Sequence, residues 1–568
     1  MNELQRLRHS AAHILAQAVK RLYPKAKLGI GPPIDDGFYY DFGELKISEG
    51  DFPRIESEIN KVIKENYQFK KTIKTRKEAE KILKNEKYKL DLLKDIKDEI
   101  SFYEDGDFID LCAGPHVKST SDVKAVKLLK VAGAYWKGSE KNDMLLRIYA
   151  TAFPSHKELE EFLKLKEEAE KRDHRKVGKE LELFFFNDIS PGAIFWQPKG
   201  MILVRELEKF WREIHDKNGY KEINTPIMVN SRLFEQSGHL KYYKESMFNV
   251  KVDKKDFYLK PMNCPEATIV YSSRLRSYKE LPLRLSEIGR LHRNELSGVL
   301  GGLFRVRQIT MDDAHIFCTE EQILDEISKV LGLIKNFYAI FNFKPVFNLS
   351  TRPEEAMGGL DLWKKAENDL EKALKLNKLD YKIREKEGAF YGPKIDVQIK
   401  DTLGREWQMA TIQLDFQMPE KFDLTYEGSD NKKHRVVMIH RAIFGSFERF
   451  IGILIEHFAG KFPLWINPIQ LIVMNITEKN RKYASNIAER LIENGFRVEF
   501  DDSNSTISKK VRDGQLMKVN YMITIGDKEE EKNKLAVRSR TGEVKFNISI
   551  DDFIKDLKKE IDNKIIKE

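Results

Sequence analysis

Two arginine-rich segments contain residue types that bind phosphate. Arg293, Glu295 and Arg305 surround a glycine-rich turn, and a second segment contains Ser446 and Arg449. A guanidinium presents several N–H donors in one plane, so it can bind phosphate oxygens and also stack on a purine ring. Taken singly, such arginines more often form surface ion pairs. Their chemistry depends on whether the fold brings the two segments together.

The chain has no standard nucleotide-binding loop. Neither GxxxxGK[ST] nor GxGxxG after a predicted strand occurs in it. Such glycine-rich loops bind phosphate through the peptide backbone. If ATP binds, side chains must hold its phosphates.

Four residues in the N-terminal part have types found in metal sites and in catalytic centres. His9 and His13 are spaced i and i+4 on a predicted helix from His9 to Leu22, so they face one way. Cys112 and His116 share a loop interrupted by a Gly-Pro pair. This spacing leaves a zinc site and a catalytic centre both open.

The composition indicates several domains in a reducing compartment. A chain of 568 residues is too long for one core, and three cysteines are too few and too scattered for a disulfide framework. The net charge of +9 gives only weak support for a polyanion partner. Neither a signal peptide nor an apolar run long enough for a membrane span occurs. We expect a cytoplasmic protein with no membrane partner.

Four segments must position these residues. We predict an α+β domain over 1–155, a charge-rich and solvated connecting helix over 156–182, a mainly antiparallel sheet flanked by helices over 183–466, and a small α/β domain over 467–568 with helices near 480–494 and 505–519.

Six longer motifs stand in order along the chain: PMNCPE (261–266), HRNELSG (292–298), RVRQITMDDAHIF (305–317), FYGPKID (390–396), WQMATIQLDF (407–416) and HRAIFGSFERF (440–450). In this order they closely resemble the motifs of threonyl-tRNA synthetases, a family of class II aminoacyl-tRNA synthetases. The resemblance runs over essentially the whole chain from His9. It implies an α+β multidomain fold: a class II antiparallel sheet with flanking helices, an N-terminal α+β editing domain and a C-terminal α/β anticodon-binding domain.

The resemblance also implies an activity and its partners. Such an enzyme attaches L-threonine to tRNA(Thr) with ATP through threonyl-adenylate, and it hydrolyses mischarged seryl-tRNA(Thr). It works as a homodimer, and Pro226 resembles the motif at the dimer interface; the alternative is a simple strand-entry proline. Two other hypotheses are a non-catalytic tRNA-binding relative and a ligase for proline or serine.

By resemblance, Cys264, His315 and His440 hold one catalytic Zn²⁺. Three protein ligands leave a position open, which the amino and hydroxyl groups of threonine can use. Valine lacks the hydroxyl, and a site built to bind one rejects its absence by roughly 10⁴–10⁵. Serine lacks only a methyl group, worth about 1–3 kcal/mol. A second, hydrolytic site is therefore expected.

The resemblance assigns further residues to the synthetic site. Arg293 and Arg305 would bind the phosphates of ATP with Mg²⁺, Glu295 the adenine, and Arg449 both phosphate and ring. Asp313 and Tyr391 would orient threonine. Other residues would line the pocket: Gln408, Thr411, Gln413 and Ser446. His239 would assist proton transfer to the ribose hydroxyl; the alternative is a surface loop histidine.

The resemblance places two further sites outside the catalytic segment. In the N-terminal domain it implies an editing centre of His9, His13, Cys112 and His116, with Asp110 and Lys89, and a metal there is the less favoured interpretation. In the C-terminal domain it implies anticodon recognition by Asn504, Glu529 and Arg538, since splayed bases offer hydrogen-bonding edges to polar side chains.

Two departures from the family are expected to matter. Many members carry an extra small domain before the editing domain, whereas this sequence starts almost directly at His9. Met311 stands where the family usually has glutamine, so a polar contact near the amino acid is lost or replaced.

Overall fold

A computed structural model describes residues 1–567 and divides the chain into two compact units, Met1–Glu167 and Glu168–Glu568. Residue 568, the last of the predicted 467–568 domain, lies outside the described residues. Helix α5 (His156–Arg172) crosses the boundary between the units. The finer boundaries at 155, 182 and 466 remain predictions.

Unit 1 packs two helices on a small antiparallel sheet. Apolar residues of α1 and α2 share one core with β3 and β8. The five-stranded sheet has the order β1-β3-β8-β7, with β2 paired to β3, and β4-β5-β6 form a second sheet. Its elements are α1 (Glu3–Leu22), β1 (Lys27–Leu28), β2 (Pro33–Ile34), β3 (Gly37–Gly43), α2 (Phe52–Glu65), β4 (Lys70–Ile73), α3 (Arg76–Ile82), α4 (Lys87–Asp95), β5 (Ser101–Asp105), β6 (Phe108–Leu111), β7 (Ala125–Tyr135) and β8 (Met144–Phe153).

The first helix starts earlier than predicted. The side chain of Asn2 accepts a hydrogen bond from the Gln5 amide at 2.8 Å, and the Gln5 side chain accepts one from the Asn2 amide at 3.1 Å. This reciprocal capping box starts the helix at Glu3. The predicted start at His9 is therefore wrong by six residues, and His9 and His13 lie well inside a regular helix.

The larger part of unit 2 is built on an eight-stranded sheet of order β11-β15-β16-β23-β20-β19-β17-β18. All its inner pairs are antiparallel, and only the two edge pairs are parallel. The mainly antiparallel sheet is therefore confirmed. Its strands are β11 (Lys221–Glu222), β15 (Leu283–His292), β16 (Gln308–Cys318), β17 (Pro345–Ser350), β18 (Tyr381–Arg384), β19 (Lys394–Lys400), β20 (Glu406–Asp415) and β23 (Val437–Ser446).

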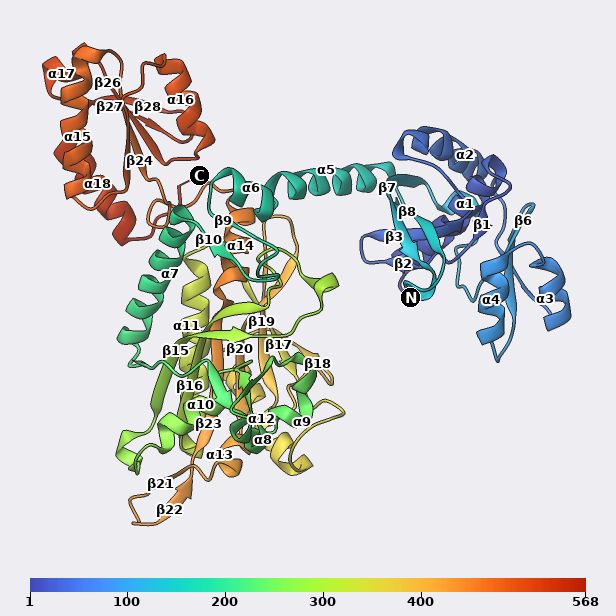
Figure 1. Cartoon of the computed structure of the whole chain (residues 1–568), viewed down its shortest axis with the longest axis horizontal. Coiled ribbons are helices and arrows are strands. Elements are labelled where there is room, and N and C mark those ends of the chain that lie inside the picture. The colour runs from blue at the N-terminus through green and yellow to red at the C-terminus, as the bar shows by residue number, and fades with distance from the viewer. Residues whose placement is uncertain (568) are drawn as a thin grey trace. The chain divides into compact units, whose positions relative to one another are not determined.

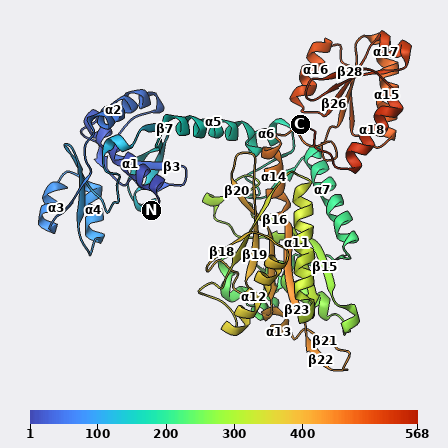
Figure 2. The ribbon, with the colours of Figure 1, turned by 180° about the vertical axis from the view of Figure 1, so that it is seen from behind.

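Side chains alternate between the two faces of this sheet. Ala314 and Ile316 on β16, like Ile412 on β20 and Ile439 on β23, point into one hydrophobic core. The helices that supply the rest of that core are α7 (Pro198–Lys217), α11 (Ile323–Ala339), α12 (Leu360–Leu376) and α14 (Phe447–His457); Figure 2 shows α11 running along the strands. The intervening residues of the same strands face away from these helices.

Short elements complete this part of unit 2: β9 (Phe184–Phe185), β10 (Phe195–Trp196), β12 (Met228–Asn230), α8 (Ser231–Ser237), α9 (His239–Tyr242), β13 (Asn249–Val252), β14 (Lys255–Leu259), α10 (Cys264–Ser272), α13 (Gln417–Lys421), β21 (Thr425–Glu427) and β22 (Lys433–Arg435).

The C-terminal part of unit 2 has helices on both faces of a five-stranded sheet of order β25-β24-β26-β27-β28, as Figure 1 shows. Helices α15 and α18 share one core with this sheet, and α16 packs on another. The α/β expectation is confirmed. The elements are β24 (Leu471–Asn475), α15 (Arg481–Glu493), β25 (Val498–Asp501), α16 (Ile507–Leu516), β26 (Tyr521–Ile525), α17 (Asp527–Lys532), β27 (Leu535–Ser539), β28 (Val544–Ile548) and α18 (Ile550–Asp562).

The predicted connecting helix is two helices with different surroundings. Only Leu159 is buried in α5, whereas α6 (His174–Glu180) buries His174, Val177 and Gly178. Asp173 separates the two and caps α6 by accepting the Arg175 amide at 2.8 Å. The expectation of a solvated segment is correct for α5 and wrong for α6. Within the described residues, no helix is long and apolar enough to cross a membrane.

Unit 1 contains a buried carboxylate that lacks a hydrogen-bond partner. Asp105, at the end of β5, is 0% exposed, and neither of its carboxylate oxygens has a partner. Burial, reinforced by the charges of Asp110 and Asp107, raises the pKa of Asp105 to about 8. Because this folded-state pKa lies above the unfolded value of about 4, unit 1 binds the proton more tightly when folded. Its stability therefore falls as pH rises from about 4 to about 8.

We predict that Asp105→Asn raises the stability of unit 1 above pH 7 and flattens its pH dependence, by about 1.4 kcal/mol for each unit of pKa difference removed. Hydrogen exchange of unit 1 peptides in the full chain, corrected for intrinsic rates, measures this. Asp98→Asn is the control, because Asp98 is an exposed aspartate of the same unit. An Asp105→Asn protein that keeps the pH dependence of the natural chain would contradict the account.

Candidate functional site

The sheet face opposite the helical core forms one wall of a cavity of about 530 Å³. Thirteen of the residues predicted for the synthetic site line it: Cys264, Arg293, Glu295, Arg305, Asp313, His315, Tyr391, Gln408, Thr411, Gln413, His440, Ser446 and Arg449. Met311 lines it as well. The fold therefore joins residues that lie up to 185 positions apart, from Cys264 to Arg449.

Strand register explains why two histidines meet. His315 on β16 pairs with His440 on β23, which in turn pairs with Gln413 on β20. All three belong to the face opposite the core. Cys264 reaches the same place from the first turn of α10. One donor atom each of Cys264, His315 and His440 lies within 4.8 Å of the others, and all three residues are buried.

The surroundings of these donors fit a zinc-type cation. The Nε2 atom of His315 is buried and has no hydrogen-bond partner. The Nε2 atom of His440 lies 2.9 Å from a carboxylate oxygen of Asp415, which leaves Nδ1 free to ligate. The other Asp415 oxygen accepts the amides of Gln417 and Met418 at 2.7 and 3.0 Å. A histidine oriented by a carboxylate is the usual outer-shell arrangement of a metal ligand. One sulfur and two imidazole nitrogens suit zinc.

Asp415 was not predicted as a functional residue. It ends the WQMATIQLDF motif, so its position next to family motif residues was the available signal. Its contact with His440 depends on the pairing of β20 with β23, which no local pattern reveals.

Three arginines concentrate positive charge in the same cavity. Burial and the charges of Arg293 and Arg305 lower the pKa of Arg449. Arg449 Nε donates to the Phe304 carbonyl at 3.1 Å, and Arg305 forms an ion pair with Glu295 at 2.9 Å. Three positive charges that line one cavity favour the binding of an anion there. Ser446 accepts the Arg449 amide at 3.0 Å and thereby caps α14.

A second residue missed by sequence reasoning, Asp312, holds the backbone that precedes Arg449. Its carboxylate accepts the amides of Ile443, Phe444 and Gly445 at 2.9–3.1 Å. The register of β16 on β23 is irregular between Met311 and Asp313. Such a bulge redirects a side chain beside an active site, and here it lets Asp312 reach three consecutive amides.

The predicted amino-acid pocket is tied together by buried acceptors. Asn263 Nδ2 donates to Asp313 at 3.2 Å. Asp396 accepts from Gln408 at 2.6 Å and from Thr411 at 3.4 Å. Gln413 donates to the Gly392 carbonyl at 3.3 Å, and Tyr391 is 7% exposed. These contacts fix the positions of the side chains that face the cavity.

His239 is not the surface histidine of the alternative hypothesis. It is 0% exposed, and its Nε2 atom lies 4.0 Å from Cys264 Sγ and 3.4 Å from Met262 Sδ. Ser237 Oγ lies 2.8 Å from its Nδ1 atom. It therefore stands directly beside the cysteine of the triad.

The four N-terminal His and Cys residues also converge. Cys112 Sγ lies 3.3 Å from His9 Nε2 and 3.4 Å from His116 Nε2, and the His13 and His116 rings are 4.3 Å apart. One donor atom of each lies within 4.8 Å of the others. Burial lowers the pKa of the three histidines and raises the pKa of Cys112 to about 11. Near neutral pH the site offers neutral imidazoles and a thiol rather than a thiolate nucleophile.

Lys89 and Asp110 form a buried ion pair next to this cluster. Their closest atoms are 2.7 Å apart, and their side chains are 4% and 1% exposed. Tyr40 donates its hydroxyl to Asp110 at 2.7 Å. The electrostatic influence of both Lys89 and Asp110 on His9 and Cys112 places the pair beside the four residues.

The predicted anticodon residues are only partly brought together. Asn504 and Glu529 follow the carboxyl ends of β25 and β26, which both run parallel to β24. Arg538 instead pairs with Met522 near the start of β26. Asn504 is exposed, whereas Glu529 accepts the Gly526 amide at 3.0 Å and Arg538 donates to the Gly542 carbonyl at 3.0 Å.

Pro226 lies in an exposed segment before β12. Ile227 and Met228 beside it are 40% and 44% exposed. β12 begins two residues after the proline.

Three protein-family models match the chain. The tRNA synthetase class II core domain (G, H, P, S and T) matches residues 248–458. The anticodon binding domain matches residues 470–560, and the threonyl and alanyl tRNA synthetase second additional domain matches residues 100–149. Core sheet, cavity and flanking domains are those of a class II aminoacyl-tRNA synthetase.

Individual relatives identify the family within this class to which the chain is similar. A threonine–tRNA ligase of Clostridium tetani (strain Massachusetts / E88) is 56% identical over 566 residues, which cover 99% of this chain and 88% of that relative. The RNA binding domain of threonyl-tRNA synthetase from Cryptosporidium parvum Iowa II is 43% identical, with a TM-score of 0.67 over 68% of this chain and 98% of that one. A putative threonyl-tRNA synthetase, ThrRS-1, from Aeropyrum pernix is 29% identical, with a TM-score of 0.61 over 69% and 96%. The chain belongs to the threonine–tRNA ligase family, which confirms the predicted family and fold class.

Proposed function

We propose that this chain joins L-threonine to tRNA(Thr), using ATP and a threonyl-adenylate intermediate, and clears mischarged seryl-tRNA(Thr) at a second site in unit 1. The observation that carries the proposal is one cavity lined by a buried Cys/His/His triad and three arginines. A non-catalytic relative would have no need to keep both the Cys/His/His triad and the three arginines.

Cys264, His315 and His440 are the residues that would hold Zn²⁺. A zinc ion held there would supply a Lewis-acid centre for the amino and hydroxyl groups of threonine. Asp415 orients His440, and Asp313, itself held by Asn263, presents a carboxylate to the amino group. The buried Tyr391 lines the same cavity and would help to orient threonine.

Adenylate formation then depends on the positioning of ATP and threonine and on the stabilisation of charge on the phosphates. Arg293 and Arg305 would bind phosphates, with Mg²⁺ arriving on ATP, and Arg449 would contact phosphate and adenine. The threonine carboxylate would attack the α-phosphorus while the bond from that phosphorus to the bridging oxygen of the β-phosphate breaks, so that threonyl-adenylate forms and pyrophosphate leaves. The arginines would stabilise the charge that develops on the phosphates. His239, beside Cys264, is positioned to assist proton transfer when the ribose hydroxyl of tRNA attacks the adenylate.

In unit 1 we propose that His9, His13, Cys112 and His116 form the editing site, with Lys89 and Asp110 in support. Neutral imidazoles can take a proton from water, so general-base hydrolysis is favoured over attack by the Cys112 thiol. The four donors could instead hold a metal ion, and zinc content distinguishes the two.

The remaining roles concern partners and location. We propose tRNA anticodon contacts at Asn504, Glu529 and Arg538, and a homodimer formed around Pro226, where exposed apolar side chains support an interface. Three unpaired cysteines support a reducing, cytoplasmic location.

The full-length protein should exchange pyrophosphate with ATP only when threonine is present. Arg449→Ala should lower kcat/KM by about 10²–10³-fold, because a charge-stabilising donor is lost. Arg435→Ala, which removes a surface ion pair with Asp423, is the matched control and should change it less than about twofold. No threonine-dependent exchange by zinc-loaded natural protein would reject the proposed function.

The protein should contain one zinc ion per chain, as measured by elemental analysis. Asp415→Asn should weaken zinc binding by about 10–100-fold in competition with a chelator, because His440 loses its orienting carboxylate. His434→Ala, at an exposed histidine paired with Asp430, should leave affinity unchanged. Unaltered affinity in Asp415→Asn would contradict the assigned triad, and two zinc ions per chain would place a metal in unit 1 as well.

The double variant His9→Ala with His13→Ala should deacylate seryl-tRNA(Thr) at least about 10²-fold more slowly, because general-base assistance is lost. Threonylation should persist, since the synthetic residues all lie in unit 2. His156→Ala, at an exposed histidine in α5, is the control. Normal clearance of seryl-tRNA by the double variant would refute the editing assignment.

A further inference from the structure

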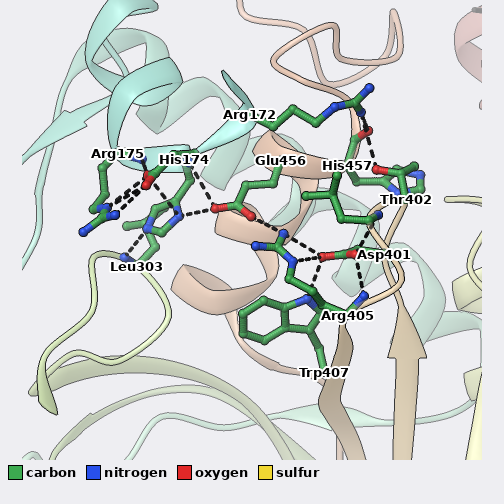
Figure 3. A network of polar contacts seen from close by, with 12 residues as sticks. Arg172, His174, Arg175, Leu303, Asp401, Thr402, Arg405, Trp407, Glu456 and His457 are labelled. Atoms are coloured by element: carbon green, nitrogen blue, oxygen red, sulfur yellow. Dashed lines mark hydrogen bonds and ion pairs between the residues drawn. The ribbon is translucent and has the colours of Figure 1, made fainter. Parts of the chain in front are cut away.

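A buried histidine stands where the connecting segment enters unit 2. His174, the first residue of α6, is 3% exposed. It belongs to a network of polar contacts that also includes the Leu303 backbone, residues 401–407 and residues 456–457, as Figure 3 shows. Nothing in the proposed chemistry uses it, yet it contacts the loop that carries Arg305.

Both ring nitrogens of His174 are engaged. Nδ1 lies 2.7 Å from Glu456 Oε1, to which it donates, and Nε2 accepts the Leu303 amide at 2.9 Å. The His174 amide also donates to Glu456 Oε1, at 3.1 Å. Donor atoms of Asp173, His174 and Glu456 are close enough together for a metal ion. Because Nε2 already accepts an N–H and Nδ1 carries a proton, no histidine lone pair is left for a metal.

The loop that His174 holds leads directly into the arginine site. Leu303 is 0% exposed, and the Phe304 ring lies 4.2 Å from His174 and 4.3 Å from Trp407. The Phe304 carbonyl accepts the hydrogen bond of Arg449 Nε. Both Phe304 and Arg305 line the cavity. A shift of this loop would therefore move the phosphate-binding arginines.

Glu456 extends the network to the strand that carries Gln408. Glu456, in the helix that begins near Arg449, also pairs with Arg405. Arg405 Nε donates to Asp401 at 2.8 Å, and Asp401 accepts Trp407 Nε1 at 2.9 Å. Since the Trp407 ring packs on the Phe304 ring, the contacts close into a ring of residues.

Gly302 makes the close approach of the loop possible. Its φ is +54°, and an added Cβ would lie 2.2 Å from His174 Nε2. The neighbouring Gly301 has open space around the same position. The close approach of the loop to His174 therefore requires glycine at position 302 but not at position 301.

We propose that His174 is a positioning residue for ATP: by accepting the Leu303 amide while Glu456 holds its other nitrogen, it sets the loop that presents Phe304 and Arg305 to the nucleotide. This rests on the proposed function of the cavity as an ATP site. Threonine binding, which depends on the Cys264, His315 and His440 side of the cavity, does not need this contact.

Two substitutions separate the two hydrogen bonds. In His174→Gln the side-chain oxygen can take the place of Nε2 and accept the Leu303 amide. In His174→Asn the amide nitrogen can take the place of Nδ1 and reach Glu456, but no side-chain atom reaches the Leu303 amide.

Threonine-dependent pyrophosphate exchange by the full chain gives KM for ATP and for threonine. His174→Asn should raise KM for ATP about tenfold or more, with KM for threonine and zinc content unchanged. His174→Gln should stay within about threefold of the natural chain for both substrates.

The glycine pair tests the same contact without touching the histidine. Gly302→Ala should raise KM for ATP, and Gly301→Ala should not; thermal unfolding of each variant checks its fold. Unchanged KM for ATP in both His174→Asn and Gly302→Ala would overturn the proposal, as would an equal rise for both substrates, which marks a merely structural role. If the natural chain itself shows no threonine-dependent exchange, the proposed function fails first and the positioning role falls with it.

Discussion

The alternation of side chains along β16, β23 and β20 is the constraint on which the synthetic site depends. One set of residues enters the core under the helices, so the other set must face the cavity. Cross-strand register then places His315 opposite His440, and His440 opposite Gln413. A slip of one residue in either pairing would turn a histidine into the core and bring an apolar side chain to the cavity.

Buried carboxylates hold the backbone that presents the charged groups. Asp312 accepts three amides before Arg449, and Glu448 accepts the Thr310 amide at 2.9 Å with both oxygens. Asp415 does the same for the turn after β20 while it orients His440. Because each carboxylate is satisfied by N–H donors, the site keeps its geometry with few flexible side chains. The contact of His174 with the Leu303 amide extends this principle to the loop before Arg305.

Local patterns and motif resemblance could predict the antiparallel sheet, the C-terminal α/β domain and the residues that line the cavity. They could not predict Asp415 or Asp312, because those roles depend on strand pairing and on a bulge. The buried part of the connecting segment was missed since only a few residues of α6, among them His174, are covered. A charge-rich stretch is predicted to be solvated when the residues that cover it lie far away in sequence, as Leu303 and Glu456 do here.

The central claim is that a sulfur and two imidazoles from three distant segments bind one cation and leave room for threonine. X-ray absorption at the zinc edge, on the full chain with only its natural metal, tests this most directly. The account predicts one sulfur and two nitrogen ligands from the protein, with light-atom coordination that changes when threonine is added and stays the same with valine. Four protein ligands on zinc would contradict this claim. Zinc coordination that stays the same when threonine is added would contradict it as well.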